Sequence, residues 1–166
     1  MFPIKIKRKA EKVFKICLKK KIKLAFAESC TGGLLSSLIT SLSNSSKIFS
    51  CGYVTYSNLS KERTLGISKK LLKKYGAVSA YIAVEMASSV RKKNYKEADI
   101  GLSITGIAGP GGATKNKKVG DVYIGLVYLK KNKLILDHEF LNLKGSRNHI
   151  RLNSVDRALD CLLRVL

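Results

Sequence analysis

The sequence has few of the residues that build metal sites or disordered chains. It contains two histidines, two prolines and 13 glycines, and its four cysteines (17, 30, 51 and 161) form no CxxC pair. Structural zinc sites usually need clustered cysteine and histidine ligands, so we expect no metal, and nothing indicates another cofactor. The modest proline and glycine content also argues against a collagen-like or largely disordered chain.

Long apolar runs are also missing. No stretch approaches the ~18 consecutive apolar residues of a membrane-spanning helix. The N-terminal region is rich in lysine and lacks the apolar run of a secretory signal. We therefore expect a cytoplasmic protein without a membrane partner, in which the reducing environment keeps all four thiols free.

Acidic residues are scarce, with 11 Asp and Glu against 32 Lys and Arg and a formal charge of +21. Such a charge favours anionic partners of any kind, including nucleic acids and phosphorylated ligands. Most of the basic residues are lysines spread along the whole chain, which is typical of a solvated surface. Because no familiar nucleic-acid-binding motif accompanies them, a nucleic-acid partner is not expected.

The sequence does contain the pattern of an α/β domain. Its 166 residues, 45% of them hydrophobic, suit a single domain over residues 1–166. Apolar spacing predicts helices over 5–21, 34–42, 69–75 and about 80–90, a short helix that carries Lys61, and a last helix from about Ser146. Strands are expected over 24–27, 51–56, 98–104, 119–129 and 133–143, the last two forming a hairpin. This order predicts a mixed sheet with helices on both faces.

Three polar segments lie where α/β folds place ligands, after strands. They are residues 28–33, 45–61 and 105–112. In the first, Thr31, Gly32 and Gly33 precede a helix, and backbone N–H groups at a helix start can hold an anion. Ser29 and Thr31 are also suited to capping that helix, which is the commoner role of such a turn.

The middle segment offers Ser46, Tyr56 and Lys61 for hydrolytic chemistry. A serine needs a base to become a nucleophile, and neither His138 nor His149 shares a motif with one. A lysine can serve if burial or nearby positive charge lowers its pKa. Geometry raises an objection, because a straight strand over 51–56, which lies between Ser46 and Lys61, would hold its own two ends about 16 Å apart. Either Ser46 folds back over the strand, or Lys61 meets Ser46 of another subunit.

Several short motifs follow one another along the chain. They are AESCTGG at 27–33, SS at 45–46, VTYSN at 54–58 with Lys61 beyond it, GAVS at 76–79, SITGIAGPGG at 103–112 and VG at 119–120. This ordered set resembles the CinA C-terminal family of nicotinamide-nucleotide amidases, from about Lys5 to the C-terminus.

The resemblance implies a three-layer α/β/α sandwich and a standalone, metal-free serine amidase. Its reaction would convert nicotinamide mononucleotide to nicotinate mononucleotide and ammonia, in pyridine-nucleotide recycling. Carried over by motif, Ser46 would be the nucleophile, Lys61 its base and Tyr56 the third member of the catalytic set.

Amide hydrolysis of a nucleotide also needs an oxyanion site and a phosphate site. Backbone N–H groups near Ser45 and in the Thr105–Gly106 loop are candidate oxyanion donors. Arg147 and Arg151 are candidate phosphate clamps, and Glu28 is a candidate for orienting hydroxyls or Lys61. The predicted substrate-binding residues are Glu28, Ser29, Thr31, Gly32, Gly33, Ser45, Thr105, Gly106 and Arg147.

The chain departs from the family pattern at three positions. Asn44 stands where glycine usually precedes the two serines, Lys118 where proline is common and Asp121 where threonine is common. Asn reaches some backbone angles less easily than glycine, which puts the presentation of Ser46 in question.

We expect a homodimer or larger homo-oligomer that binds a small nucleotide. The alternative is a non-catalytic, competence- or damage-associated CinA-type protein that binds nucleotides or DNA.

Overall fold

A mixed sheet forms the centre of the structure. The computed structural model describes residues 2–93 and 98–166. Within these ranges the strands are β1 (Leu24–Glu28), β2 (Phe49–Val54), β3 (Ile100–Gly106), β4 (Asp121–Lys130) and β5 (Lys133–Asn142), arranged in the order β2-β1-β3-β4-β5. β1 is parallel to β2 and β3, whereas β4 is antiparallel to both β3 and β5. The predicted mixed sheet is confirmed.

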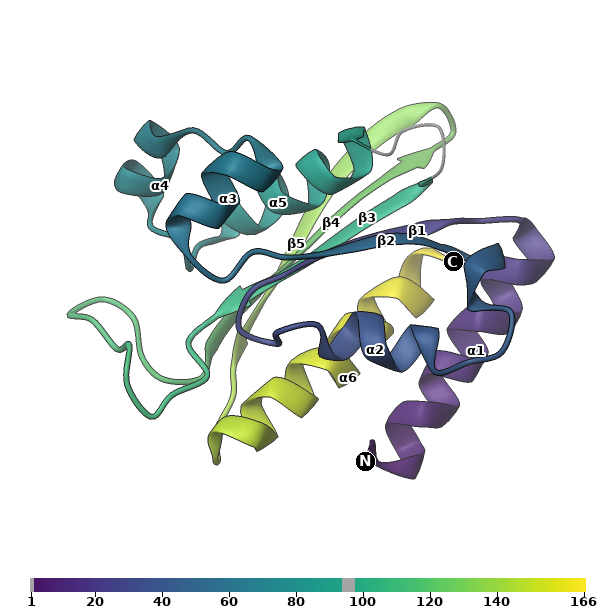
Figure 1. Ribbon diagram of the computed structural model, residues 1–166, viewed down its shortest axis with the longest axis horizontal. Helices are drawn as coiled ribbons and strands as arrows, with labels where there is room; N and C mark the ends of the chain where they lie inside the picture. The colour runs from purple at the N-terminus through teal and green to yellow at the C-terminus, as the bar shows by residue number, and fades with distance from the viewer. Residues whose placement is uncertain (1, 94–97) are drawn as a thin grey trace.

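Helices cover both faces of this sheet (Figure 1). One layer contains α1 (Ile4–Lys20), α2 (Leu34–Thr40) and α6 (Arg147–Val165), and the other contains α3 (Asn58–Leu65), α4 (Lys69–Tyr75) and α5 (Ala80–Lys93). A 3₁₀ turn, η1 (Ser45–Lys47), precedes β2. Each layer buries its own apolar cluster against the sheet. The predicted three-layer α/β/α arrangement is therefore confirmed.

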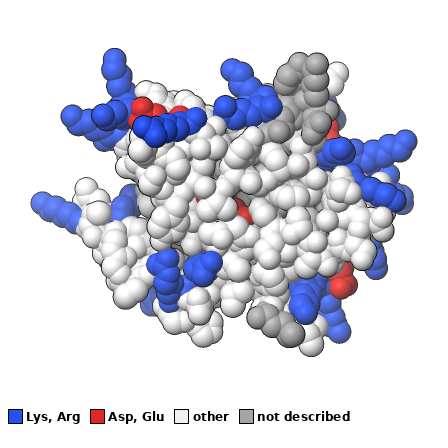
Figure 2. All heavy atoms as spheres, viewed as in Figure 1, with Lys and Arg blue, Asp and Glu red and all other residues white. Residues whose placement is uncertain are grey.

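The first helix shows how the lysine-rich composition is accommodated. On α1 the residues Ile6, Ala10, Val13 and Cys17 are buried, at the three- and four-residue spacing of one helical face. On the side of the molecule shown in Figure 2, Lys and Arg side chains lie in separate groups around the rim, and the centre is mostly uncharged. None of the helices in the described ranges is long and apolar enough to span a membrane.

Glycines allow α5 to pack unusually close to the sheet. A Cβ atom built on Gly125 of β4 would lie 2.2 Å from the Ala83 carbonyl oxygen, and one on Gly101 of β3 would lie 2.2 Å from that of Ala87. The short distance between β3 and α5 also allows the Ser103 hydroxyl to donate to the Ala83 carbonyl at 2.6 Å. At Gly101 and Gly125 the backbone of the sheet therefore lies directly against the backbone of α5, while Ile82, Met86 and Val90 of the helix pack in the apolar cluster on this face.

Gly125→Ala is expected to destabilise the protein by about 3 kcal/mol, because the added methyl group overlaps a helix carbonyl that cannot move alone. Urea unfolding followed by circular dichroism measures this free energy. Gly111→Ala is the matched control, since a Cβ there meets nothing within 4 Å, and its expected effect is within about 0.5 kcal/mol. Equal stabilities for the two variants would contradict the close packing of α5.

The boundaries of β2 differ from the prediction in a way that matters for the site. The strand was expected over 51–56, but it runs from Phe49 to Val54. Thr55 and Tyr56 therefore belong to the loop that follows β2. Because β1, β2 and β3 are parallel, the residues that follow all three strands lie at one edge of the sheet.

Candidate active site

Lys61 is buried at this edge of the sheet, with 1% of its surface exposed. It lies on α3 one turn before Leu65, the other buried residue of that helix. Ser57 fixes the start of α3 through a capping box, in which its hydroxyl accepts from Ser60 N and its N–H donates to the Ser60 hydroxyl, both at 3.0 Å. The helix start therefore holds Lys61 pointing into the protein.

The ammonium of Lys61 donates to three oxygens, one of which is a serine hydroxyl. Nζ lies 3.0 Å from Ser29 Oγ, 2.7 Å from the Thr55 carbonyl and 3.5 Å from the Tyr56 carbonyl. Among the residues that the structure describes, no carboxylate pairs with it. Burial of the cation lowers the pKa of Lys61 to about 8. An amine with this pKa is neutral in a useful fraction of molecules near physiological pH.

Ser29 is held rigidly, because the backbone on both sides of it is hydrogen-bonded. Its N–H donates to the Ile104 carbonyl at 2.9 Å, which extends the β1–β3 pairing by one residue. Its carbonyl accepts from Gly32 N at 3.1 Å, which closes the turn before α2. The hydroxyl therefore has a fixed position within general-base distance of Lys61.

Glu28 stabilises this turn, and its carboxylate is hydrogen-bonded to groups within the protein. The side chain is completely buried. Its carboxylate accepts from Leu35 N at 3.1 Å, from Ser36 N at 2.8 Å and from the Ser36 hydroxyl at 2.7 Å. Direct contact between Glu28 and a substrate, one of its predicted roles, is therefore not supported. The Glu28 carboxylate instead has a positioning role, because it links the first turn of α2 to the end of β1.

A cavity of about 200 Å³ opens above Ser29 and Lys61. Its wall comes from the loops after β1, β2 and β3, from the segment before α5 and from the start of α6. The lining residues are Ser29, Cys30, Tyr56, Lys61, Ala77, Val78, Thr105, Gly106, Ile107, Ala108, Gly109, Gly111, Gly112 and Arg147. The predicted substrate-binding residues Ser29, Thr105, Gly106 and Arg147 thus come together with Lys61 and Tyr56.

Tyr56 and Arg147 meet at the mouth of this cavity. Arg147 is the first residue of α6, which begins where the sequence predicted, and the Ser146 hydroxyl caps the start of this helix. Its guanidinium donates to the Tyr56 hydroxyl at 2.9 Å and to the Gly109 carbonyl at 2.5 Å. Both acceptors are uncharged, so the positive charge of Arg147 remains available to an anionic ligand.

Cys30 lies beside Ser29 and also lines the cavity, but it is a poor nucleophile. Burial raises the pKa of its thiol to about 12. Because the thiolate is the reactive form of cysteine, this thiol is inert near neutral pH. The hydroxyl of Ser29 is the group that has a base beside it.

The predicted pairing of Ser46 with Lys61 is wrong within one chain. Ser45 and Ser46 lie in η1, before the amino end of β2, whereas Lys61 contacts the residues that follow its carboxyl end. The strand between them does not fold back, because it pairs with β1 along its length. Neither Ser45 nor Ser46 lines the cavity. The hydroxyl that faces Lys61 is that of Ser29, for which only a binding role had been predicted.

The glycine turn before α2 shapes the site but does not line it. Thr31 is fully buried, and Gly32 and Gly33 adopt left-handed angles with φ of 61° and 89°. The predicted side-chain capping is not seen, because Gly33 is the N-cap of α2 and no side chain caps it. The three residues lie outside the cavity wall, and their role in holding an anion stays a prediction. They turn the chain sharply enough to keep Ser29 at the sheet edge.

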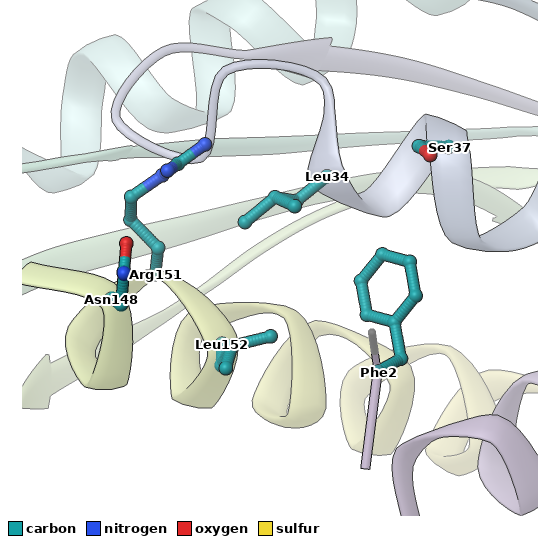
Figure 3. A pocket seen from close by; sticks show the side chains of 6 residues that line it. All are labelled: Phe2, Leu34, Ser37, Asn148, Arg151 and Leu152. Atoms are coloured by element: carbon teal, nitrogen blue, oxygen red, sulfur yellow. The ribbon is translucent and has the colours of Figure 1, made fainter.

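Arg151 faces a different cavity from Arg147. Its guanidinium donates to the Thr31 carbonyl at 2.8 Å, and Figure 3 shows it reaching from α6 toward the loop before α2. This second cavity, about 280 Å³, is lined by Phe2, Leu34, Ser37, Asn148, Arg151 and Leu152. Arg151 thus stabilises the turn after Ser29 through its hydrogen bond to Thr31. It does not line the cavity above Ser29 and Lys61, so its predicted role as a phosphate clamp does not fit this position.

The three departures from the family pattern have local explanations. Asn44 adopts the left-handed conformation, with φ of 62°, which Asn tolerates better than most residues. The Asp121 carboxylate accepts from Lys118 N and from the Asn142 side chain, both at 2.8 Å. These bonds close the base of the loop between β3 and β4, which projects beyond the sheet in Figure 1.

Comparison with known proteins shows which proteins this chain is similar to. A protein of Thermoanaerobacter sp. (strain X514), named for competence-damage induction, is 49% identical over 161 residues, covering 94% of this chain and 36% of that protein. A CinA-like protein of Dictyoglomus thermophilum is 45% identical over 156 residues. The chain therefore spans about a third of the length of these curated relatives.

Solved structures match over most of their length. The competence/damage inducible protein CihA from Agrobacterium tumefaciens has a TM-score of 0.91 and 33% identity, with 99% of this chain and 98% of that chain covered. A CinA superfamily protein from Escherichia coli has a TM-score of 0.87 and 28% identity, covering 97% and 90%. Residues 6–166 match the CinA C-terminal domain. The chain belongs to the CinA C-terminal domain family.

Proposed function

We propose that the protein is a serine amidase that hydrolyses the carboxamide of nicotinamide mononucleotide. The observation that carries this proposal is the 3.0 Å contact between Lys61 Nζ and Ser29 Oγ at the floor of a cavity. A buried lysine with a lowered pKa next to a serine hydroxyl is a variant of the serine-protease arrangement, in which an amine replaces the imidazole.

The first half of the reaction forms an ester on Ser29. Neutral Lys61 accepts the hydroxyl proton while Oγ attacks the carboxamide carbon. The tetrahedral intermediate then breaks its C–N bond, and the Lys61 ammonium gives the proton to the departing amide nitrogen, which leaves as ammonia. Backbone N–H groups of the loop at 105–112, which lines the cavity, are the candidates for stabilising the oxyanion.

The second half releases the acid. Lys61 removes a proton from water, the resulting hydroxide attacks the ester carbonyl, and the acyl–oxygen bond breaks. Ser29 recovers its proton from Lys61, so the net reaction consumes one amide and one water and yields one carboxylate and one ammonium ion. The Thr55 and Tyr56 carbonyls keep Nζ in place in both halves.

The choice of a nucleotide substrate is supported by charge and by the family resemblance. Arg147 brings a guanidinium to the cavity mouth with only uncharged hydrogen-bond acceptors, which suits a phosphate. The Tyr56 side chain beside it is well placed to contact the pyridine or ribose. The overall charge of +21 raises the local concentration of any anionic substrate.

The direct experiment is to incubate the purified protein with nicotinamide mononucleotide and to measure ammonia and nicotinate mononucleotide. Nicotinamide riboside, which lacks the phosphate, is the matched control substrate and is expected to react far more slowly. Absence of ammonia from every pyridine nucleotide, together with DNA binding that weakens steeply with salt, would reject the amidase in favour of the non-catalytic alternative.

The pH dependence of kcat/KM should identify the base. Because Lys61 acts only when unprotonated, activity is expected to rise about tenfold per pH unit below its pKa and to level off above about pH 8. A buffer series from acidic to alkaline pH, with circular dichroism to check folding, measures this profile. A midpoint near the ordinary pKa of histidine, or no dependence at all, would contradict the role of Lys61.

A further inference from the structure

The strand β5 lies at one edge of the sheet and pairs only with β4 in the described part of the chain. Its ten residues therefore present a row of N–H and C=O groups along the side that faces away from β4. Such an edge is a template for another strand, and soluble proteins usually protect it with charges, proline or a covering segment. β5 contains no proline. Its charged residues are Lys133 at the first position, and Asp137 and Glu139, which pair with arginines of α6.

Three side chains of β5 on the α5 side of the sheet are apolar and exposed, and the exposed His138 lies among them on the same face. Leu134, Leu136 and Phe140 have 47%, 54% and 50% of their surface exposed, and neighbouring Leu129 of β4 has 56%. We call these four residues the β5 patch. They alternate along the strand, so they share one face, and α5 covers β3 and β4 more than β5. His138 separates Leu136 from Phe140 on this face, but four exposed apolar side chains so close together in a lysine-rich chain are still a sign of an interaction surface.

The opposite side of β5 is electrostatically balanced. Asp137 pairs with Arg164 of α6 at 3.1 Å, and Glu139 pairs with Arg157 and Arg164. The strand itself has two acidic residues and one lysine in a chain of net charge +21. Two copies of this chain, each with a net charge of +21, repel one another, but the ion pairs at this edge leave little unpaired charge there to add to the repulsion.

From these observations we infer that β5 pairs antiparallel with β5 of a second copy of the chain, joining the two sheets into one. The two copies are related by a two-fold axis perpendicular to the sheet. The α5 side of one sheet therefore continues into the α5 side of the other. The β5 patches then meet as one apolar surface, and the Asp137, Glu139, Arg157 and Arg164 clusters meet beneath it. An interface of this kind is self-complementary, as a two-fold dimer requires.

Sedimentation velocity over a range of protein concentrations, at about 0.15 M salt, tests the proposal. The wild-type chain is expected to sediment as a dimer, and Leu136→Lys and Phe140→Lys are each expected to give the monomer of 18.3 kDa. Ile4→Lys is the matched control, since Ile4 on α1 is 69% exposed and lies outside the patch; it should remain dimeric. All three positions are on the surface, so each variant is expected to fold, and circular dichroism checks this.

Hydrogen exchange separates strand pairing from other contacts. The β5 amides are expected to exchange more slowly as the concentration of wild-type protein rises, and this dependence should vanish in Leu136→Lys. A monomeric wild-type protein, a dimer that survives both β5 substitutions, or β5 exchange that is independent of concentration would overturn the proposal. The inference does not depend on the proposed function, because Leu136 and Phe140 lie outside the catalytic cavity.

Discussion

Replacing Ser29 with alanine is expected to lower the turnover of nicotinamide mononucleotide by at least about 10⁴-fold, because the reaction then has no nucleophile. Steady-state ammonia release measures the effect. The substitution removes one hydroxyl that accepts a hydrogen bond from Lys61, while the backbone bonds of Ser29 to Ile104 and Gly32 remain. The turn is therefore expected to keep its shape.

Ser46→Ala is the matched control for this prediction, since it removes the same hydroxyl from η1 at the other end of β2. Its turnover is expected to stay close to that of the wild type, and both variants should have the same circular dichroism spectrum. The opposite ranking, with Ser46→Ala inactive and Ser29→Ala active, would show that a second subunit supplies the nucleophile to Lys61.

Replacing Lys61 with methionine is expected to lower turnover by about 10³-fold, because Ser29 then loses its base. Methionine has a similar length and fills the buried space without the cost of burying a charge. The residual rate should no longer rise with pH through about 8, since the group responsible for that rise is gone.

Lys61→Arg distinguishes a base from a mere positive charge. A guanidinium stays protonated in proteins, so this variant keeps the cation but cannot accept the serine proton. Its turnover is expected to be as low as that of Lys61→Met. A Lys61→Arg variant with most of the wild-type activity would mean that the charge of residue 61, and not its basicity, supports the reaction.

Much of the fold could be predicted from the sequence because its helices and strands have clear periodicity. The apolar spacing of α1 and the alternation in the β4–β5 hairpin depend on local sequence, and both were placed within a few residues. The turn between β4 and β5 also follows from local chemistry, with Lys131 and Asn132 at φ of 50° and 61°. The close approach of α5 to Gly101 and Gly125 could not be predicted, because it depends on which elements pack together.

The site was predicted less well, for a geometric reason. The three loops that build the cavity were identified because each follows a strand, but the assignment of Ser46 placed the nucleophile before β2. In a parallel arrangement the residues at and just after the carboxyl ends of β1, β2 and β3 converge, so Ser29, Tyr56 and Thr105 all line one cavity. The position of Ser29 directly after β1 was therefore the available signal. The burial of Lys61, which sets its pKa, is a tertiary property that the sequence pattern does not display.

The most direct test of the central claim, that Lys61 activates Ser29, is covalent labelling with a fluorophosphonate, which reacts with activated serine hydroxyls. Peptide mapping by mass spectrometry is expected to find the label on Ser29, at a rate that rises with pH through about 8, and to find almost none on Ser29 in Lys61→Met. A label on Ser46, or labelling of Ser29 that is equally fast without Lys61, would contradict the account.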